Sequence, residues 1–239
     1  MENKMKIEIW SDVMCPFCYI GKRNFESALE QFSDKEEIEV IWKSFQLNPY
    51  IPEIPNESYQ DYLIKHKGMS AEQVKGMLDN VTQIAKRAGL EFNLEQAVIV
   101  NSMNAHKIIQ FAKTKGLGDE AEERLFHAFF TEGKNIADLD TLTQLGKEIG
   151  LEKTEMDNAF RDEKYSSLVK QDIQEAQQLG VQGVPFFVLN RKYAISGAQP
   201  SEAFSENLKV AFAEWRKLNP KTKLEVTQGQ SCTPDGNCD

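Results

Sequence analysis

Two pairs of cysteines are the residues of this sequence whose type and spacing could do chemistry. Cys15 and Cys18 are separated by two residues near the start of the chain, and Cys232 and Cys238 lie in the last eight residues. A C-x-x-C pair can form and break a reversible disulfide, and it can also supply half of a zinc site. Zinc needs two further ligands, and the Cys232 and Cys238 spacing is wider than usual for one. We therefore favour thiol-disulfide exchange and expect no metal.

The elements predicted around Cys15 place it at the start of a helix. Lys6–Trp10 alternates apolar and charged residues, which is typical of a strand with one covered face. Tyr19–Phe32 has apolar residues at helical spacing, and Pro16 suits a first helical turn. A helix N-terminus favours a thiolate over a thiol. We expect Cys15 to face solvent and attack, Cys18 to resolve, and this setting to stabilise the reduced form more than to speed attack.

The remaining pattern predicts a second strand, a long helical block, and a closing hairpin and helix. The second strand is Ile38–Phe45, the hairpin joins Val184–Leu189 to Lys192–Ile195, and the last helix is Pro200–Leu218. Helical periodicity between them covers residues 58–67, 70–88, 94–115, 119–131, 138–149 and 153–179. The order is β-α-β, helices, β-β-α. This predicts an α/β unit over residues 1–54 and 164–219, an all-helical insertion over 55–163, and a flexible tail over 220–239.

Composition and charge exclude several classes of protein. The 239 residues hold 28 Lys and Arg against 37 Asp and Glu, a net charge of −9, and 41% are hydrophobic. Such a charge repels nucleic acids and anionic membrane surfaces, and no apolar run approaches the ~18 residues of a membrane span. Four cysteines are too few for a disulfide scaffold. We expect a cytoplasmic globular protein with no nucleic-acid or membrane partner.

Three segments resemble one known family. Residues 11–21 (SDVMCPFCYIG) resemble the active-site segment of DsbA-like thioredoxin-fold oxidoreductases, in particular the FrnE-like branch. Residues 101–106 (NSMNAH) with 125–130 (LFHAFF) resemble the helical insertion of that branch, and 183–188 (GVPFFV) resembles its proline loop. The resemblance implies a thioredoxin fold with a large helical insertion, exchange at Cys15 and Cys18, and a cis peptide at Val184-Pro185 facing them.

The resemblance also implies a substrate class and a set of contact residues. The expected partners are protein or peptide disulfides and thiols, with a cellular thiol as reductant. No bound cofactor is expected, although glutathione could be a co-substrate. Besides Val184 and Pro185, we take Phe17 as a substrate contact, and His106 either lines a substrate groove or is a structural histidine.

The sequence departs from the family pattern at one position that bears on proton transfer. Many relatives carry a buried acid six residues before the first cysteine, where this chain has Ile9. The proton acceptor for Cys18 is therefore undefined by the sequence. We interpret Asp12 as a turn or capping residue and the acidic run Glu120–Glu123 as a solvated face.

The role of Cys232 and Cys238 stays open. The two cysteines flank a Pro-Asp-Gly turn, and we consider three roles for them: an auxiliary redox pair that relays disulfides to Cys15, a metal-capturing pair, or an incidental disulfide. The inserted fold is also shared by glutathione-dependent isomerases and transferases of the hydroxychromene-carboxylate isomerase and kappa type. The resolving Cys18 argues against that activity. A binding or chaperone-like module would tolerate the loss of both Cys15 and Cys18.

Overall fold

A computed structural model describes residues 4–52 and 57–221 of the chain. Its sheet contains, over these residues, the strands β1 (Met5–Ser11), β2 (Ile38–Ser44), β3 (Phe186–Leu189) and β4 (Tyr193–Ser196) in the order β2-β1-β3-β4. β1 runs parallel to β2, and β3 is antiparallel to both β1 and β4. Asn190 and Arg191 have φ of 51° and 55°, the backbone that a two-residue hairpin turn requires. The predicted β-α-β and β-β units therefore join into one sheet.

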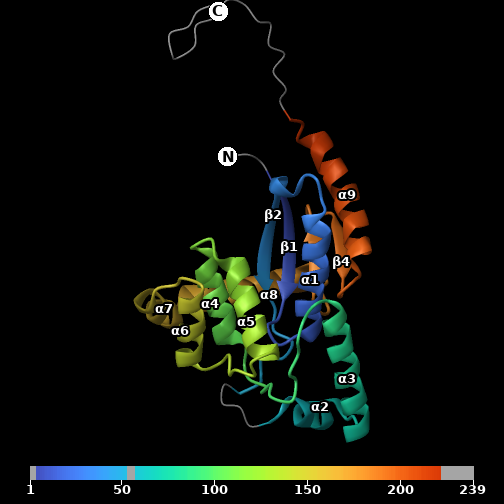
Figure 1. The fold of residues 1–239 in the computed structure, drawn as a ribbon. Helices are drawn as coiled ribbons and strands as arrows, with labels where there is room; N and C mark the ends of the chain where they lie inside the picture. Colours follow the sequence, from blue (N-terminus) through green and yellow to red (C-terminus); the bar gives the residue numbers. More distant parts are fainter. Residues whose placement is uncertain (1–3, 53–56, 222–239) are drawn as a thin grey trace, which may run out of the picture.

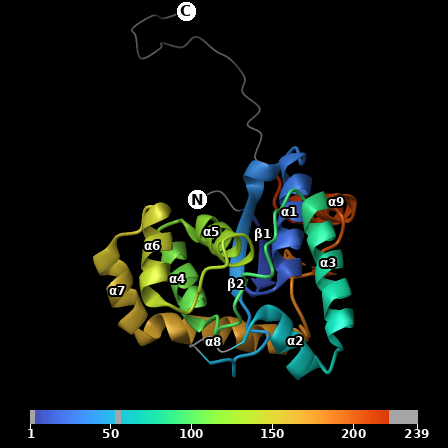
Figure 2. The ribbon, with the colours of Figure 1, turned by 60° about the horizontal axis from the view of Figure 1, so that its bottom comes forward.

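Helices cover both faces of this sheet (Figure 1). The inward residues of β1, Met5, Ile7 and Ile9, pack against α1 (Pro16–Glu30) and α9 (Ser201–Leu218) in one apolar core. On the other face, α8 (Glu163–Gln178) contacts β2 and also α4 (Met103–Lys113). The view in Figure 2 shows α8 running across the molecule beneath the sheet. Residues 12–15 connect β1 to α1 and are called the redox loop because they end at Cys15. This loop thus leaves the central part of a layered α/β unit.

The helices between β2 and α8 surround the end of β1 at which the chain enters α1. They are α2 (Tyr59–Lys67), α3 (Ala71–Arg87), α4, α5 (Gly118–Phe130), α6 (Leu139–Glu148) and α7 (Lys153–Arg161). In Figure 1, α2 and α3 lie near the first turn of α1, and α4 to α7 form a second group beside the sheet. Tyr19 of α1 stacks on Phe126 of α5 with ring centroids 4.8 Å apart. The inserted helices and α1 therefore share one core.

Two predicted helices differ from the structure. α4 begins at Met103 rather than Leu94, because the segment before it is held by other bonds: Val98 forms a β-bridge with Ser58, and the Asn101 amide donates to the Ile51 carbonyl. The predicted helix 153–179 is two helices. Asp162 has extended backbone (ψ 117°), which ends α7, and its carboxylate accepts from the Lys164 N–H to cap α8.

The helices of the described part of the chain are each too short or too polar to cross a membrane. Cys232 and Cys238 lie outside the described residues.

Candidate active site at Cys15 and Cys18

Cys15 is the residue from which α1 starts. It is the N-cap, with extended backbone (φ −90°, ψ 112°), and Pro16 follows at the first helical position. The Cys15 N–H donates to the Asp12 carbonyl (2.9 Å), and the Cys18 N–H donates to the Cys15 carbonyl (3.0 Å). Both thiols are free. The predicted position of Cys15 at a helix N-terminus is what the structure has.

The exposure of the pair differs from the prediction that Cys15 faces solvent. Cys15 is only 5% exposed and Cys18 1%, whereas Phe17 between them is 41% exposed. Cys15 and Cys18 belong to the core that α1 shares with the insertion, against which the partly buried Tyr59 of α2 and Val184 also pack. The sequence could not show this cover, because Tyr59 lies far from Cys15 along the chain. Little of Cys15 is therefore open to a substrate disulfide in this structure.

The loop before β3 lies directly against the redox pair. The Val184–Pro185 peptide bond is cis. The Cys15 thiol donates to the Val184 carbonyl oxygen over 3.5 Å. Behind it, α1 approaches so closely that a Cβ on Gly21 would lie 3.0 Å from Pro185 Cγ. Gly21 thus allows this loop to sit beside Cys15.

Cys18 is held as a thiol by its surroundings. Burial raises the pKa of Cys18 well above its ordinary value, and its contact with Cys15 raises it further. The backbone of Asp12 and the side chain of Ser11 act in the opposite direction and lower the pKa, because polar groups near the sulfur favour the thiolate. Cys18 consequently needs a proton acceptor before it can attack.

Asp12 organises the loop that carries Cys15. Its carboxylate oxygens accept from the N–H groups of Met14 (3.3 Å) and Leu47 (2.8 Å), so it ties the redox loop to the chain leaving β2. The predicted role as a turn residue is confirmed. Oδ1 of Asp12 also lies 3.5 Å from Nε2 of His106 on α4. His106 has no exposed surface, so it faces Asp12 and lines no groove open to substrate in this structure.

One member of the acidic run Glu120–Glu123 is buried, which corrects the prediction of a solvated face. Glu122 is 1% exposed, and burial raises its pKa to about 7 against the lowering effect of His106 and Lys22. Glu123 is half-buried and forms an ion pair with Arg23. Glu122 lies on the face of α5 that also carries Leu125, Phe126 and Phe129, at helical spacing. That spacing is the signal by which the sequence could have identified it.

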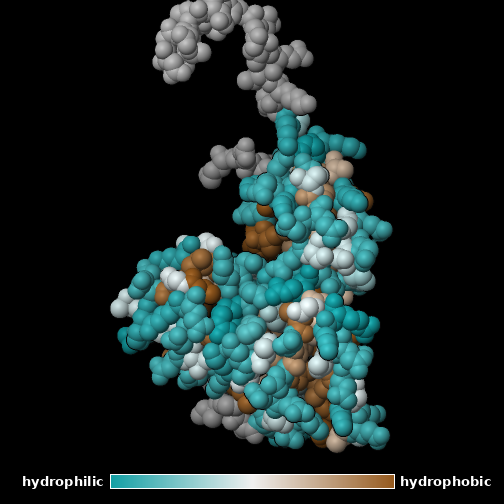
Figure 3. All heavy atoms as spheres, viewed as in Figure 1, coloured by the Kyte–Doolittle hydropathy of each residue, from teal (hydrophilic) through white to brown (hydrophobic). Residues whose placement is uncertain are grey.

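Apolar side chains flank the redox loop at the surface. Phe17 lies between the cysteines, Leu47 bonds to Asp12 through its backbone, and Tyr50 follows in the same segment. Leu47 is 52% and Tyr50 92% exposed. The surface in Figure 3 is mostly hydrophilic, with several separate hydrophobic patches, one of them beside α3. An apolar peptide could contact these side chains.

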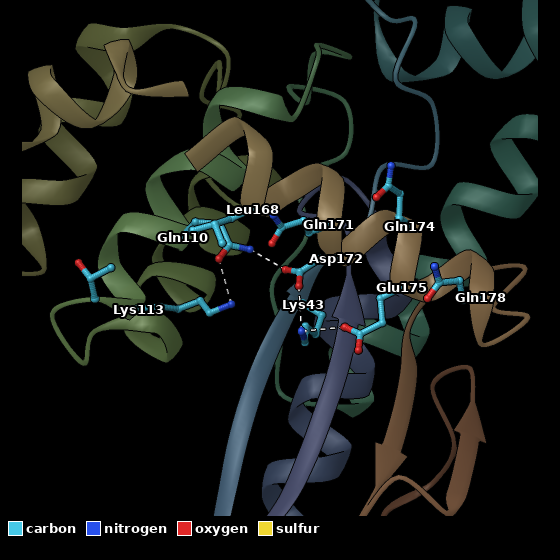
Figure 4. Close-up of a pocket in the computed structure, with 10 residues that line it drawn as sticks. Lys43, Gln110, Lys113, Leu168, Gln171, Asp172, Gln174, Glu175 and Gln178 are labelled. Carbon is cyan, nitrogen blue, oxygen red and sulfur yellow. Dashed lines mark hydrogen bonds and ion pairs between the residues drawn. The ribbon is translucent and has the colours of Figure 1, made fainter. Parts of the chain in front are cut away.

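A groove of about 610 Å³, lined mostly by polar and charged residues, lies beside α8 (Figure 4). Its charged side chains already have partners: Lys43 pairs with Asp172 and Glu175, and Lys113 donates to the Gln110 side chain. Neither Cys15 nor Cys18 lines it. Within residues 4–52 and 57–221, no three His, Cys, Asp or Glu side chains are grouped closely enough to hold a metal ion.

The chain is similar in sequence to two proteins, one of them of known structure. It is 33% identical to a probable DsbA oxidoreductase from Streptomyces coelicolor, with a TM-score of 0.84 and coverage of 98% of both chains. It is 28% identical over 205 residues to the uncharacterized protein YwbO of Bacillus subtilis, covering 84% of this chain and 94% of that one.

Two more distant structures share the fold. The cytosolic disulfide reductase DsbM from Pseudomonas aeruginosa is 19% identical, with a TM-score of 0.60 and coverage of 87% of this chain and 99% of DsbM. A second structure of DsbM contains GSH. A 2-hydroxychromene-2-carboxylate isomerase is 14% identical, with a TM-score of 0.62 and coverage of 92% of this chain and all of the isomerase. The model of the DsbA-like thioredoxin domain matches residues 6–209. The chain, an α/β protein with a helical insertion, therefore belongs to the DsbA-like thioredoxin domain family.

Proposed function

We propose that this protein is a thiol-disulfide oxidoreductase of the FrnE-like branch, acting on protein or peptide disulfides. The observation that carries the proposal is the juxtaposition of three features: a free thiol at the N-cap of α1, a second thiol one turn later, and a backbone carbonyl 3.5 Å from the first sulfur. Cys15 is the nucleophile and Cys18 resolves the mixed disulfide. The backbone of Val184 pairs with an extended substrate, with Pro185 and Phe17 as further contacts.

We propose net reduction of substrates in the cytoplasm, with a glutathione-like thiol as reductant. The fold shared with a cytosolic disulfide reductase, which is also known with GSH, supports this direction. The assignment of residues 55–163 as one insertion, and of Cys232 and Cys238 as an auxiliary redox pair, belongs to the same proposal.

A glutathione-dependent isomerase shares the fold as well, but it would have no use for the second thiol. Cys18 contacts Cys15 within the core, which favours exchange over isomerisation.

Reduction of insulin disulfides by the wild type, Cys15→Ser and Cys18→Ser tests whether the protein is an oxidoreductase or an isomerase. We expect Cys15→Ser to abolish reduction and Cys18→Ser to accumulate mixed disulfides with substrate. Wild-type activity in Cys15→Ser would refute the proposal.

A further inference from the structure

Apart from cysteines and tyrosines, six ionisable side chains are buried in the described part of the chain, and three of them have ordinary ion-pair partners. Glu8 pairs with Arg191, Lys22 with carboxylates of α1 and α5, and Asp172 with Lys43. The other three are Asp12, His106 and Glu122. They come from the redox loop, α4 and α5, so the insertion supplies two of the three.

Two of these three groups, His106 and Glu122, leave hydrogen-bonding capacity unused. Both ring nitrogens of His106, and Oε2 of Glu122, are buried without a hydrogen-bond partner among the described residues. The Asp12 carboxylate lies 3.5 Å from Nε2 of His106, within ion-pair distance. Buried polar groups are rarely left unpaired, and the exceptions call for an explanation such as a proton-transfer role.

The groups connect to Cys18 through residues 11 and 12. The Asp12 carbonyl accepts from the N–H of Cys15, and the Cys15 carbonyl accepts from the N–H of Cys18, so the backbone joins Asp12 to the thiol pair. The Asp12 backbone and the Ser11 side chain both lower the pKa of the Cys18 thiol, and the Ser11 hydroxyl is buried without a hydrogen-bond partner among the described residues. Cys18, Ser11, Asp12 and His106 are each at most 1% exposed, so bulk water has little access to the thiol proton.

We infer that the Asp12–His106 pair accepts the proton of Cys18 when a mixed disulfide is resolved, taking the place of the buried acid that Ile9 replaces. This inference rests on the proposed function. Asp12 takes the proton and passes it across the 3.5 Å contact to Nε2 of His106. His106 is a positioning residue, because it acts through Asp12 and does not touch the sulfur.

The steps balance as follows. The Cys15 thiolate attacks a substrate disulfide, forms a Cys15–substrate bond and releases the first substrate half as a thiolate. Cys18 then loses its proton to neutral His106, and its thiolate attacks the Cys15 sulfur. The new Cys15–Cys18 disulfide releases the second half as a thiolate. The substrate gains the two electrons that the two cysteines lose, and imidazolium returns its proton to that thiolate or to solvent.

The surroundings of His106 set the pH range in which its ring can accept a proton. Burial lowers its pKa, but Asp12, Glu122 and the Phe45 carbonyl raise it, so that the net change is upward from 6.5. Glu122 itself faces Lys22 and Asp119 besides His106 and Asp12. A general base is most effective with a pKa near the working pH. Resolution should therefore speed up as pH rises through the pKa of His106 and then level off.

The test separates attack from resolution with a peptide disulfide whose halves carry different fluorophores. All proteins are full-length and carry Cys232→Ser and Cys238→Ser, so that the tail cannot resolve. Release of the first half, measured with Cys18→Ser added, reports attack by Cys15. Release of the second half in proteins that keep Cys18 reports resolution. Both rates are followed from pH 5.5 to 9.

We expect His106→Gln to slow resolution at pH 7.5 by about 10²-fold and to change attack by less than about threefold. Because His106→Gln lacks the proton acceptor, its rate of resolution should keep rising about tenfold per pH unit instead of levelling off. Glu122→Gln keeps the acceptor, and it should move the midpoint of the profile to lower pH. It serves as the second variant if His106→Gln does not fold.

Asp172→Asn is the matched control, because it also neutralises a buried carboxylate but far from the cysteines. Its resolution profile should match that of the wild type. A levelling profile in His106→Gln, an unmoved midpoint in Glu122→Gln, or equal loss of attack and resolution would overturn the inference and leave Cys15 and Cys18 as the exchanging pair. Absence of any mixed disulfide in Cys18→Ser would instead overturn the proposed function, and the inference with it.

Discussion

Glu122→Gln should make the protein more stable at alkaline pH, because the wild type buries an acid there that prefers to be neutral. Burial raises the pKa of Glu122 from 4.5 to about 7. As pH rises through this window, the unfolded chain loses the Glu122 proton before the folded chain does. The folded state therefore loses stability relative to the unfolded state as the pH increases. Glutamine has nearly the same shape and cannot ionise, so the variant avoids that loss.

The magnitude follows from the two pKa values. A difference between 4.5 and about 7 corresponds to about 3 kcal/mol once both states are ionised, and roughly 2.5 kcal/mol of this develops between pH 5 and pH 8. For a chain of this size, such a change is about 5 to 10 °C in Tm. At each pH, the unfolding free energy of Glu122→Gln minus that of the wild type gives an increment. The quantity to measure is the increment at pH 8 minus the increment at pH 5. Differences in hydrogen bonding between the two side chains cancel in this subtraction.

Glu123→Gln is the matched control on the next residue. Burial raises the pKa of Glu123, but its hydrogen bonds with Arg23 and Tyr19 outweigh that effect and lower it below 4.5. Its stabilisation is therefore present above the unfolded pKa and is lost only as pH falls through the folded value. Denaturant unfolding should show Glu123→Gln less stable than wild type by a similar amount at pH 5 and pH 8. An increment for Glu122→Gln that is equal at both pH values would refute the buried-acid reasoning.

Further predictions concern the loop and the tail. Gly21→Ala should lower the rate of insulin reduction several-fold, because the added Cβ, 3.0 Å from Pro185 Cγ, pushes the Val184 carbonyl away from Cys15. The control is Gly76→Ala in α3, where no atom lies within 4 Å of the added Cβ; it should keep activity and gain roughly 0.5 to 1 kcal/mol in unfolding free energy. Equal activities of the two variants would exclude the contact. Under mild oxidation, Cys18→Ser should link Cys15 to Cys232 or Cys238 in peptide maps, and only intermolecular adducts would exclude a relay. Truncation of residues 220–239 should then slow turnover.

Local patterns were enough to predict the sheet and the start of the redox helix. Alternation in Lys6–Trp10 and the position of Pro16 are decided by neighbouring residues, and the structure has β1 and α1 at those places. The segment 94–102 was predicted as helix because its apolar spacing is helical. Its backbone is instead bonded to Ser58 and, through the Asn101 N–H, to the Pro52 carbonyl in the loop after β2, which are distant in sequence. Periodicity carries no information about such partners.

The chemistry of the site shows the same division between local and distant information. Cys15, Cys18 and the Val184–Pro185 loop are recognisable from short motifs. The exposure of Cys15 and the surroundings of His106 are not, because the covering residues belong to helices inserted between β2 and α8. His106 carries no local sign of its partner: Asp12 lies on a different element, and only the packing of α4 against the redox loop brings them to 3.5 Å.

The insertion thus does more than enlarge the fold. Without α4 and α5, the Asp12 carboxylate would lose His106, and the cysteines would lose the apolar cover that keeps Cys18 protonated. A thioredoxin-like unit with Ile9 in its apolar core has no acid in the usual place to serve Cys18. The helices that cover the pair and withdraw it from water therefore also carry His106, whose ring lies 3.5 Å from the Asp12 carboxylate. Cover and proton acceptor arise from one structural addition, so a variant that loosens α4 should impair resolution before it impairs attack.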